Sequence, residues 1–85
     1  MAYKVVITPA AKRDIASLDK AVQQRVKTVI DRLAEEPRPF GVVKLAGEKD
    51  AYRIRVGDYR VIYDIRDKKL LVLVIEVGHR GDIYR

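Results

Sequence analysis

Three arginines lie close together in the stretch YRIRVGDYR, residues 52–60. Apolar and charged residues alternate on both sides of a Gly-Asp pair, which predicts a β-hairpin closed by a two-residue turn. In that register Arg55 lies directly opposite Arg60, and Arg53 lies diagonal to Arg60 on the same face. Like charges in directly opposed positions destabilise a sheet by roughly 0.2–1 kcal/mol per pair. The cluster therefore favours a polyanion site, because guanidinium groups pair bidentately with phosphates and carboxylates.

The alternative for this cluster is a set of solvated surface charges separated by counterions. We favour the anion site, because the pattern predicts no acidic residue between the three arginines on their face. The apolar neighbours Ile54, Val56 and Val61 are expected to point the other way, into the core. A one-residue slip of the register would bury Arg53 and Arg55, which the cost of burying charge disfavours.

A second arginine-containing stretch, GHRGDIYR, ends the sequence at residues 78–85. If this tail folds over the open face of the sheet, Arg80 and Tyr84 join the hairpin arginines. Arginine binds phosphate, and a tyrosine ring can stack on a nucleobase with a gain of about 1–3 kcal/mol. The residues leave a second interpretation open, in which Tyr84 completes the core and Arg80 is a surface charge.

Groups able to transfer a proton near neutral pH are scarce around these residues. Arginine stays protonated, and tyrosine ionises only near pH 10. His79 is the one histidine, and at a strand end we interpret it as structural or solvated. Glu76 and Asp82 are candidate bases, supported only by their proximity.

Metal and nucleophile chemistry are not indicated by the sequence. It has no cysteine, one histidine and no Asp/Glu cluster with ligand spacing, so we expect no metal. Ser17 lies within a predicted helix without a neighbouring base, and no glycine-rich loop could hold a phosphate. We therefore expect no cofactor either.

The N-terminal half is predicted to form a strand and two helices. Residues 3–8 (YKVVIT) are rich in β-branched side chains and predict the strand, after which Thr8-Pro9 is a typical helix start. Asp19 is expected to cap a second helix, with an apolar stripe at helical spacing. Pro37 disfavours helical geometry at the preceding residue, so this helix is expected to end at Glu36.

The C-terminal half is predicted to be a sheet. Residues 42–45 could add a short edge strand before the hairpin strands at 51–56 and 59–65. Residues 70–77 are apolar at nearly every position, which predicts a central strand covered on both faces. The fold class is α+β with the order β-α-α-β-β-β: a twisted, mostly antiparallel sheet with two antiparallel helices packed on one face.

Length and composition limit the class of protein. Eighty-five residues suit one domain, residues 1–85, and 48% hydrophobic with 35% charged residues is typical of a soluble globular protein. The sequence has no long apolar stretch, so we expect neither a signal peptide nor a membrane span and predict a cytoplasmic protein. The net charge of +6 suits a polyanionic partner such as nucleic acid or an acidic protein.

These residues together carry a family resemblance. The chain resembles the RelE/ParE superfamily of bacterial and archaeal toxins from type II toxin–antitoxin modules, and is more similar to its RelE branch. The resemblance covers nearly the whole chain, and the combination of the hairpin with the C-terminal GHR…IYR pattern is its most specific part. The matching stretches are TPAAKRDIASLD, LAEEPRPFG, KLAG, YRIRVGDYRVIYDI and VIEVGHRGDIYR.

The resemblance implies an activity and roles for five residues. RelE-like toxins are mRNA interferases, endoribonucleases that cut mRNA in the ribosomal A site by attack of a 2′-OH on the adjacent phosphodiester. Arg53 and Arg55 match two basic positions, and Arg60 matches a phosphate-binding arginine. Arg80 matches an arginine that acts on the leaving group, and Tyr84 matches a tyrosine that stacks on or orients the nucleotide. The activity would need the ribosome but no metal.

The resemblance also implies partners and leaves alternatives. The partners would be an acidic RelB-like antitoxin, the ribosome and mRNA, with operator DNA reached only through the antitoxin. One alternative is the ParE branch, whose members poison DNA gyrase. Another is a non-catalytic nucleic-acid-binding module, for which four arginine–phosphate contacts on a single strand predict a log–log salt slope of roughly −3.

Overall fold

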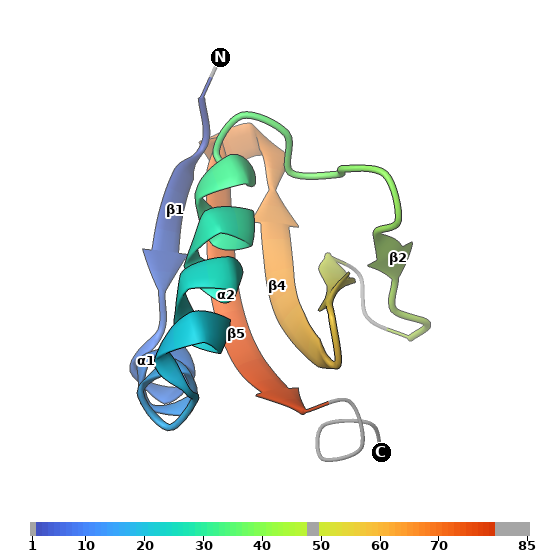
Figure 1. Cartoon of the computed structure of the whole chain (residues 1–85). Helices are drawn as coiled ribbons and strands as arrows, with labels where there is room; N and C mark the ends of the chain where they lie inside the picture. The colour runs from blue at the N-terminus through green and yellow to red at the C-terminus, as the bar shows by residue number, and fades with distance from the viewer. Residues whose placement is uncertain (1, 48–49, 80–85) are drawn as a thin grey trace.

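The computed structural model describes residues 2–47 and 50–79, which form one sheet and two helices. The strands run in the order β1-β5-β4-β3-β2; only the β1–β5 pair is parallel. Figure 1 shows both helices on the same side of the sheet, so the predicted α+β class is confirmed. The predicted order β-α-α-β-β-β gains one strand, because the optional edge strand at 42–45 forms at residues 43–44. The elements are β1 (Lys4–Ile7), α1 (Pro9–Ala16), α2 (Lys20–Arg32), β2 (Val43–Lys44), β3 (Ala51–Val56), β4 (Tyr59–Arg66), the 3₁₀ helix η1 (Asp67–Lys69) and β5 (Leu71–His79).

The helix boundaries follow the predicted caps in part. Thr8 is the N-cap of α1, and its side-chain oxygen accepts a hydrogen bond from the backbone N–H of Ala11 at 3.2 Å. Asp19 occupies the N-cap of α2, but its side chain makes no capping bond, which differs from the prediction. Helix α2 also ends at Arg32 rather than Glu36, because its last turn tightens into i→i−3 bonds such as Leu33 N–H to the Ile30 carbonyl.

The core lies between the helices and the sheet. Helix α2 contributes Val26, Ile30 and Leu33, which are fully buried or nearly so. The predicted orientation of the hairpin is confirmed, since Val56 and Val61 pack into this core with Ile54 beside them. The largest fully buried side chain is that of Tyr63, whose hydroxyl donates to the Pro37 carbonyl at 2.8 Å. The other buried apolar residues are Ala11, Ala51, Ile65, Val72, Val74 and Val77.

Strand β5 is central, as predicted, but only one of its faces is covered by helices (Figure 1). Val72 and Val74 on the helix side are fully buried, whereas Leu71 and Leu73 on the other side keep partial exposure. The expectation of cover on both faces is therefore wrong for the described residues. A run of apolar residues predicts a central strand but cannot tell how its second face is covered.

A register shift interrupts β5 near its C-terminal end. Ile62 of β4 pairs with Glu76, and the next residue, Tyr63, pairs with Val74, so Ile75 has no partner of its own. This extra residue is a β-bulge, and it reverses the alternation of side chains that follow it. Val77 therefore joins Val72 and Val74 in the core.

Neither helix in the described part of the chain is long and apolar enough to cross a membrane.

Candidate functional site

The β3–β4 hairpin has the register predicted from the sequence. Val56 pairs with Tyr59 across the Gly-Asp turn, Arg55 pairs with Arg60, and Arg53 pairs with Ile62. Because paired residues share a face, the three arginines lie on the face of the sheet opposite the helices, which we call the open face. Three of the five predicted site residues are thus brought together.

The three arginines differ in their surroundings. Arg55 is exposed, and its Nε donates a hydrogen bond to the Gly57 carbonyl at 3.1 Å. Arg53 is half-buried between Ile62 on β4 and Val43 on β2. Arg60 is also half-buried, and its Nε and Nη1 atoms are shielded from solvent. The site therefore combines one exposed cation with two half-buried cations.

The sheet register extends this face across four strands. Val43, Arg53, Ile62 and Glu76 form one row from β2 to β5, and Arg55, Arg60 and Gly78 form the next. Among the residues that the structure describes, no acidic residue separates the three arginines, as expected, but Glu76 borders them from β5. Strict alternation of side chains would have put Glu76 in the core, and the bulge at Ile75 puts it on the open face.

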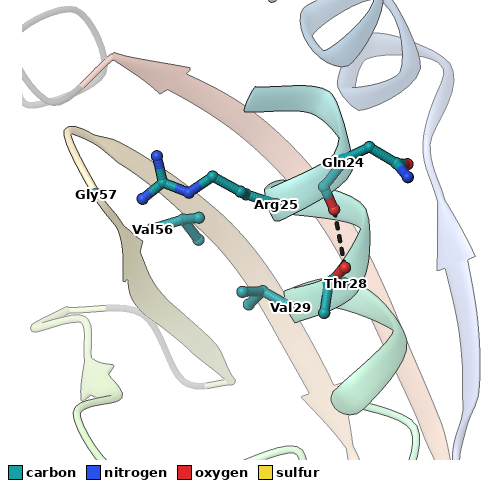
Figure 2. Close-up of a pocket in the computed structure, with 6 residues that line it drawn as sticks. All are labelled: Gln24, Arg25, Thr28, Val29, Val56 and Gly57. Carbon is teal, nitrogen blue, oxygen red and sulfur yellow. Dashed lines mark hydrogen bonds between the residues drawn. The ribbon is translucent and has the colours of Figure 1, made fainter. Parts of the chain in front are cut away.

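A fourth arginine, which the sequence analysis missed, lies over the hairpin turn. Figure 2 shows the Arg25 side chain extending from α2 toward Gly57, across a solvent-open hollow of about 400 Å³ with Val29 and Val56 in its lining. A Cβ added to Gly57 would stand 2.6 Å from Nη2 of Arg25. The helical pattern marks Arg25 as exposed, and only the packing of α2 against β3 brings it to the hairpin.

The other residues singled out in the sequence are either on other surfaces or outside the described part of the chain. His79 pairs with Tyr59 on the helix-side face, and their rings meet edge to face with centroids 5.3 Å apart. Arg80, Tyr84 and the candidate base Asp82 lie outside the described residues. Ser17 ends α1, with its hydroxyl donating to the Asp14 carbonyl at 2.7 Å, and takes no part in the face.

A separate polar cluster lies at the other end of β4. Arg38 donates two hydrogen bonds to Asp67, at 3.2 and 2.8 Å, and the Tyr3 hydroxyl donates a third at 2.7 Å. These bonds, that of Arg38 first, hold the pKa of Asp67 below its usual value. The bond to Asp67 likewise raises the pKa of Tyr3. The Arg38 guanidinium also lies 5.2 Å from the centre of the Tyr52 ring, so the cluster fastens the α2–β2 connection to the sheet.

In residues 2–47 and 50–79, no group of three or more histidine, aspartate or glutamate side chains is placed to hold a metal ion. Besides its cations, the open face carries two carboxylates, Glu76 and Asp64, of which Asp64 is engaged by Arg66. Arginines held in place by a sheet can bind a phosphodiester and stabilise the negative charge that develops on it during a reaction.

Known proteins are similar to this chain in both sequence and fold. The model of the ParE toxin family, from the parDE type II toxin–antitoxin system, matches residues 5–84. The mRNA interferase toxin RelE of Escherichia coli K12 is 33% identical over 88 residues, which cover 99% of this chain and 92% of that protein.

Two solved structures agree with that relationship. The archaeal RelE–RelB complex from Pyrococcus horikoshii OT3 matches with a TM-score of 0.84 and 38% identity, covering 96% of this chain and 99% of that chain. The intact RelBE toxin–antitoxin complex of E. coli matches with a TM-score of 0.80 and 31% identity, covering 92% and 96%. The chain belongs to the RelE/ParE superfamily of type II toxin–antitoxin toxins, as the sequence resemblance indicated.

Proposed function

We propose that this protein is a RelE-type toxin that cleaves mRNA in the ribosomal A site and so stops translation. The observation that carries the proposal is the arginine face, where Arg55 and Arg60 are directly opposed and Arg53 is diagonal to Arg60. Such a face is costly without an anion and well suited to a phosphodiester. The similarity to proteins named mRNA interferase supports the choice of RNA as the anion.

In the proposed reaction the RNA 2′-OH attacks the neighbouring phosphorus, giving a 2′,3′-cyclic phosphate and a 5′-OH end. Arg53, Arg55 and Arg60 stabilise the negative charge that develops on the phosphorane, as preorganised donors do at other oxyanions. Arg80 acts on the leaving 5′ oxygen and Tyr84 orients the nucleotide, as the resemblance implies for their positions. The need for a 2′-OH restricts the activity to RNA.

We further propose that the reaction uses the ribosome and no metal. The arginines supply charge but do not by themselves align an RNA strand for in-line attack, so a ribosome that fixes the codon provides much of the positioning. The site of action is then the cytoplasm, where translation occurs.

The test is cleavage of mRNA in a reconstituted translation mixture, mapped by primer extension with and without ribosomes. Wild-type protein should cut within the A-site codon only when ribosomes are present, and EDTA-treated toxin should be equally active. Arg60→Ala should lose roughly 10²-fold or more in rate, the usual effect of removing an oxyanion donor. Arg66→Ala is a matched control, because Arg66 lies on the same strand but outside the cluster. Its guanidinium forms an ion pair with Asp64 at 3.2 Å. Uncut mRNA from active wild-type toxin would reject the proposal.

An acidic RelB-like antitoxin is the proposed partner, and operator DNA is reached only through it. The net charge of +6 and the exposed arginine face favour an acidic segment. The similarity to chains solved in RelE–RelB complexes supports the same choice. Co-expression with a RelB-like antitoxin, followed by co-purification, tests this partner directly.

The second candidate is inhibition of DNA gyrase, because the matching family model is that of ParE toxins. It predicts inhibited supercoiling in a purified gyrase assay and intact mRNA in a translation mixture. The two assays on one preparation separate the candidates. Salt-dependent binding to RNA without cleavage or gyrase inhibition would instead indicate a non-catalytic binding module.

A further inference from the structure

The proposed cleavage needs a group that accepts the proton of the attacking 2′-OH, and the arginines cannot serve. A general base must be deprotonated near the working pH and lie within reach of the proton it removes. Arginine remains protonated in proteins. A carboxylate on the open face, beside the arginines, could act as this general base.

The bulge in β5 brings one carboxylate to that face. Ile75 has no partner in β4, so the side chains after it change sides, and Glu76 falls in one row with Ile62 and Arg53. Without the extra residue, Glu76 would follow Val72 and Val74 into the core. Bulges that redirect a side chain are over-represented beside active sites.

Helix α1 holds this irregular part of β5 in place. The Thr8 hydroxyl donates to the Ile75 carbonyl at 3.3 Å, and Asp14 Oδ2 accepts a hydrogen bond from the Val77 backbone N–H at 3.0 Å. Strand β1 pairs with β5 only as far as Ile7 and Val74. Beyond that point, these two hydrogen bonds satisfy the backbone groups on either side of Glu76. These bonds stabilise the bulged backbone that places Glu76 on the open face.

The surroundings of Glu76 suit a proton acceptor. It is half-buried, and within the described residues its carboxylate makes no hydrogen bond or ion pair. Arg60 is its diagonal neighbour on β4, at a spacing of roughly 7–8 Å in regular sheets. That spacing leaves room for a phosphate on the arginine and a ribose hydroxyl on the carboxylate. The apolar Ile62 is directly opposite Glu76 and separates it from Arg53 in their row.

We propose that Glu76 is the general base of the cleavage, an inference that rests on the proposed function. Its carboxylate takes the 2′-OH proton while the 2′ oxygen forms a bond to phosphorus, and the bond from phosphorus to the 5′ oxygen breaks. The 5′ oxygen leaves with a proton from water. The hydroxide so formed takes the proton held on Glu76, which restores the carboxylate.

The test compares Glu76→Gln with Asp64→Asn in single-turnover cleavage of mRNA on programmed ribosomes. Asp64 is a matched control, because it is a carboxylate on the same face of β4 and is already engaged by Arg66 at 3.2 Å. Glu76→Gln should cleave at least roughly 10²-fold more slowly than wild type, the usual contribution of a general base, and Asp64→Asn should match wild type. A Glu76→Gln rate within a few-fold of wild type would overturn the assignment.

Two further measurements separate base catalysis from other roles of the carboxylate. Affinity for a 2′-O-methyl mRNA, which cannot be cut, should be unchanged or tighter in Glu76→Gln, because a negative charge near the arginines has been removed. Weaker binding that accounts for the lost rate would contradict the proposal.

The second measurement uses an mRNA with sulfur in place of the scissile 5′ oxygen, whose leaving group needs no proton. The slower cleavage by Glu76→Gln should persist with this substrate. If the difference from wild type disappears, Glu76 acts as the general acid and not as the base. If wild-type protein cuts nothing, the proposed function itself fails.

Discussion

Arg55 and Arg60 occupy directly opposed positions across the β3–β4 hairpin, with Arg53 diagonal to Arg60 on the same face. Opposed like charges reduce the stability of a sheet. Stability and function are therefore expected to pull in opposite directions at this pair.

The first prediction is a repulsive coupling between these two arginines. In a double-mutant cycle with Arg55→Gln and Arg60→Gln, the pair should be coupled unfavourably by roughly 0.2–1 kcal/mol. The measurement is urea unfolding of the four proteins at low salt. Raising the salt concentration should shrink the coupling, since exposed charges are screened. A favourable coupling at low salt would show that the two guanidinium groups do not repel.

The second prediction concerns the glycine at the hairpin turn. Gly57 has φ +61° and lies against the end of the Arg25 side chain. Gly57→Ala should lower the free energy of unfolding by about 1–2 kcal/mol, because a Cβ disfavours left-handed backbone. Adding Arg25→Ala should recover little of this loss, since the flexible guanidinium can move aside. Gly57→Asn should cost less than Gly57→Ala, because asparagine tolerates this conformation. Equal losses in both would argue that the backbone conformation is not the cause.

A third prediction tests the support of the bulge by helix α1. Asp14→Ala removes the acceptor of the Val77 N–H and should cost about 1–3 kcal/mol, the penalty for an unsatisfied buried polar group. Asp14→Asn keeps a side-chain oxygen and should be much closer to wild type. Thermal unfolding of the three proteins measures the difference. If Asp14→Ala is as stable as Asp14→Asn, the hydrogen bond does not support the strand.

The fourth prediction is a dependence of stability on pH through Asp67. Arg38 and Tyr3 lower the pKa of Asp67 in the folded protein relative to the unfolded chain. The resulting stabilisation is complete at pH values above the pKa of aspartate in the unfolded chain, about 3.9. It is lost as the pH falls through the lower pKa of Asp67 in the folded protein. Wild type should therefore lose stability relative to Asp67→Asn as the pH drops below about 4. Parallel stability curves for the two proteins in this range would contradict the lowered pKa.

Much of the hairpin followed from local sequence. The Gly-Asp pair fixes a two-residue turn, and alternation then assigns each neighbour to a face, so the pairing of Arg55 with Arg60 could be predicted. The start of α1 at Thr8-Pro9 is equally local, because its cap uses groups three residues apart. The end of α2 was less predictable, because Pro37 only sets a limit beyond which the helix cannot continue. The helix ends before that limit, at Arg32.

The sequence by itself determined the fold class and the arginine face, because both depend on periodicity or on turn residues close together in the chain, and it determined the family through its similarity to known members. The tertiary structure decided which further residues reach that face and the hairpin turn. Glu76 reaches it only through a bulge whose backbone groups are bound by Thr8 and Asp14, more than sixty positions away. Arg25 reaches the hairpin only because α2 packs beside β3. Such contacts join distant parts of the chain, and no local pattern contains them.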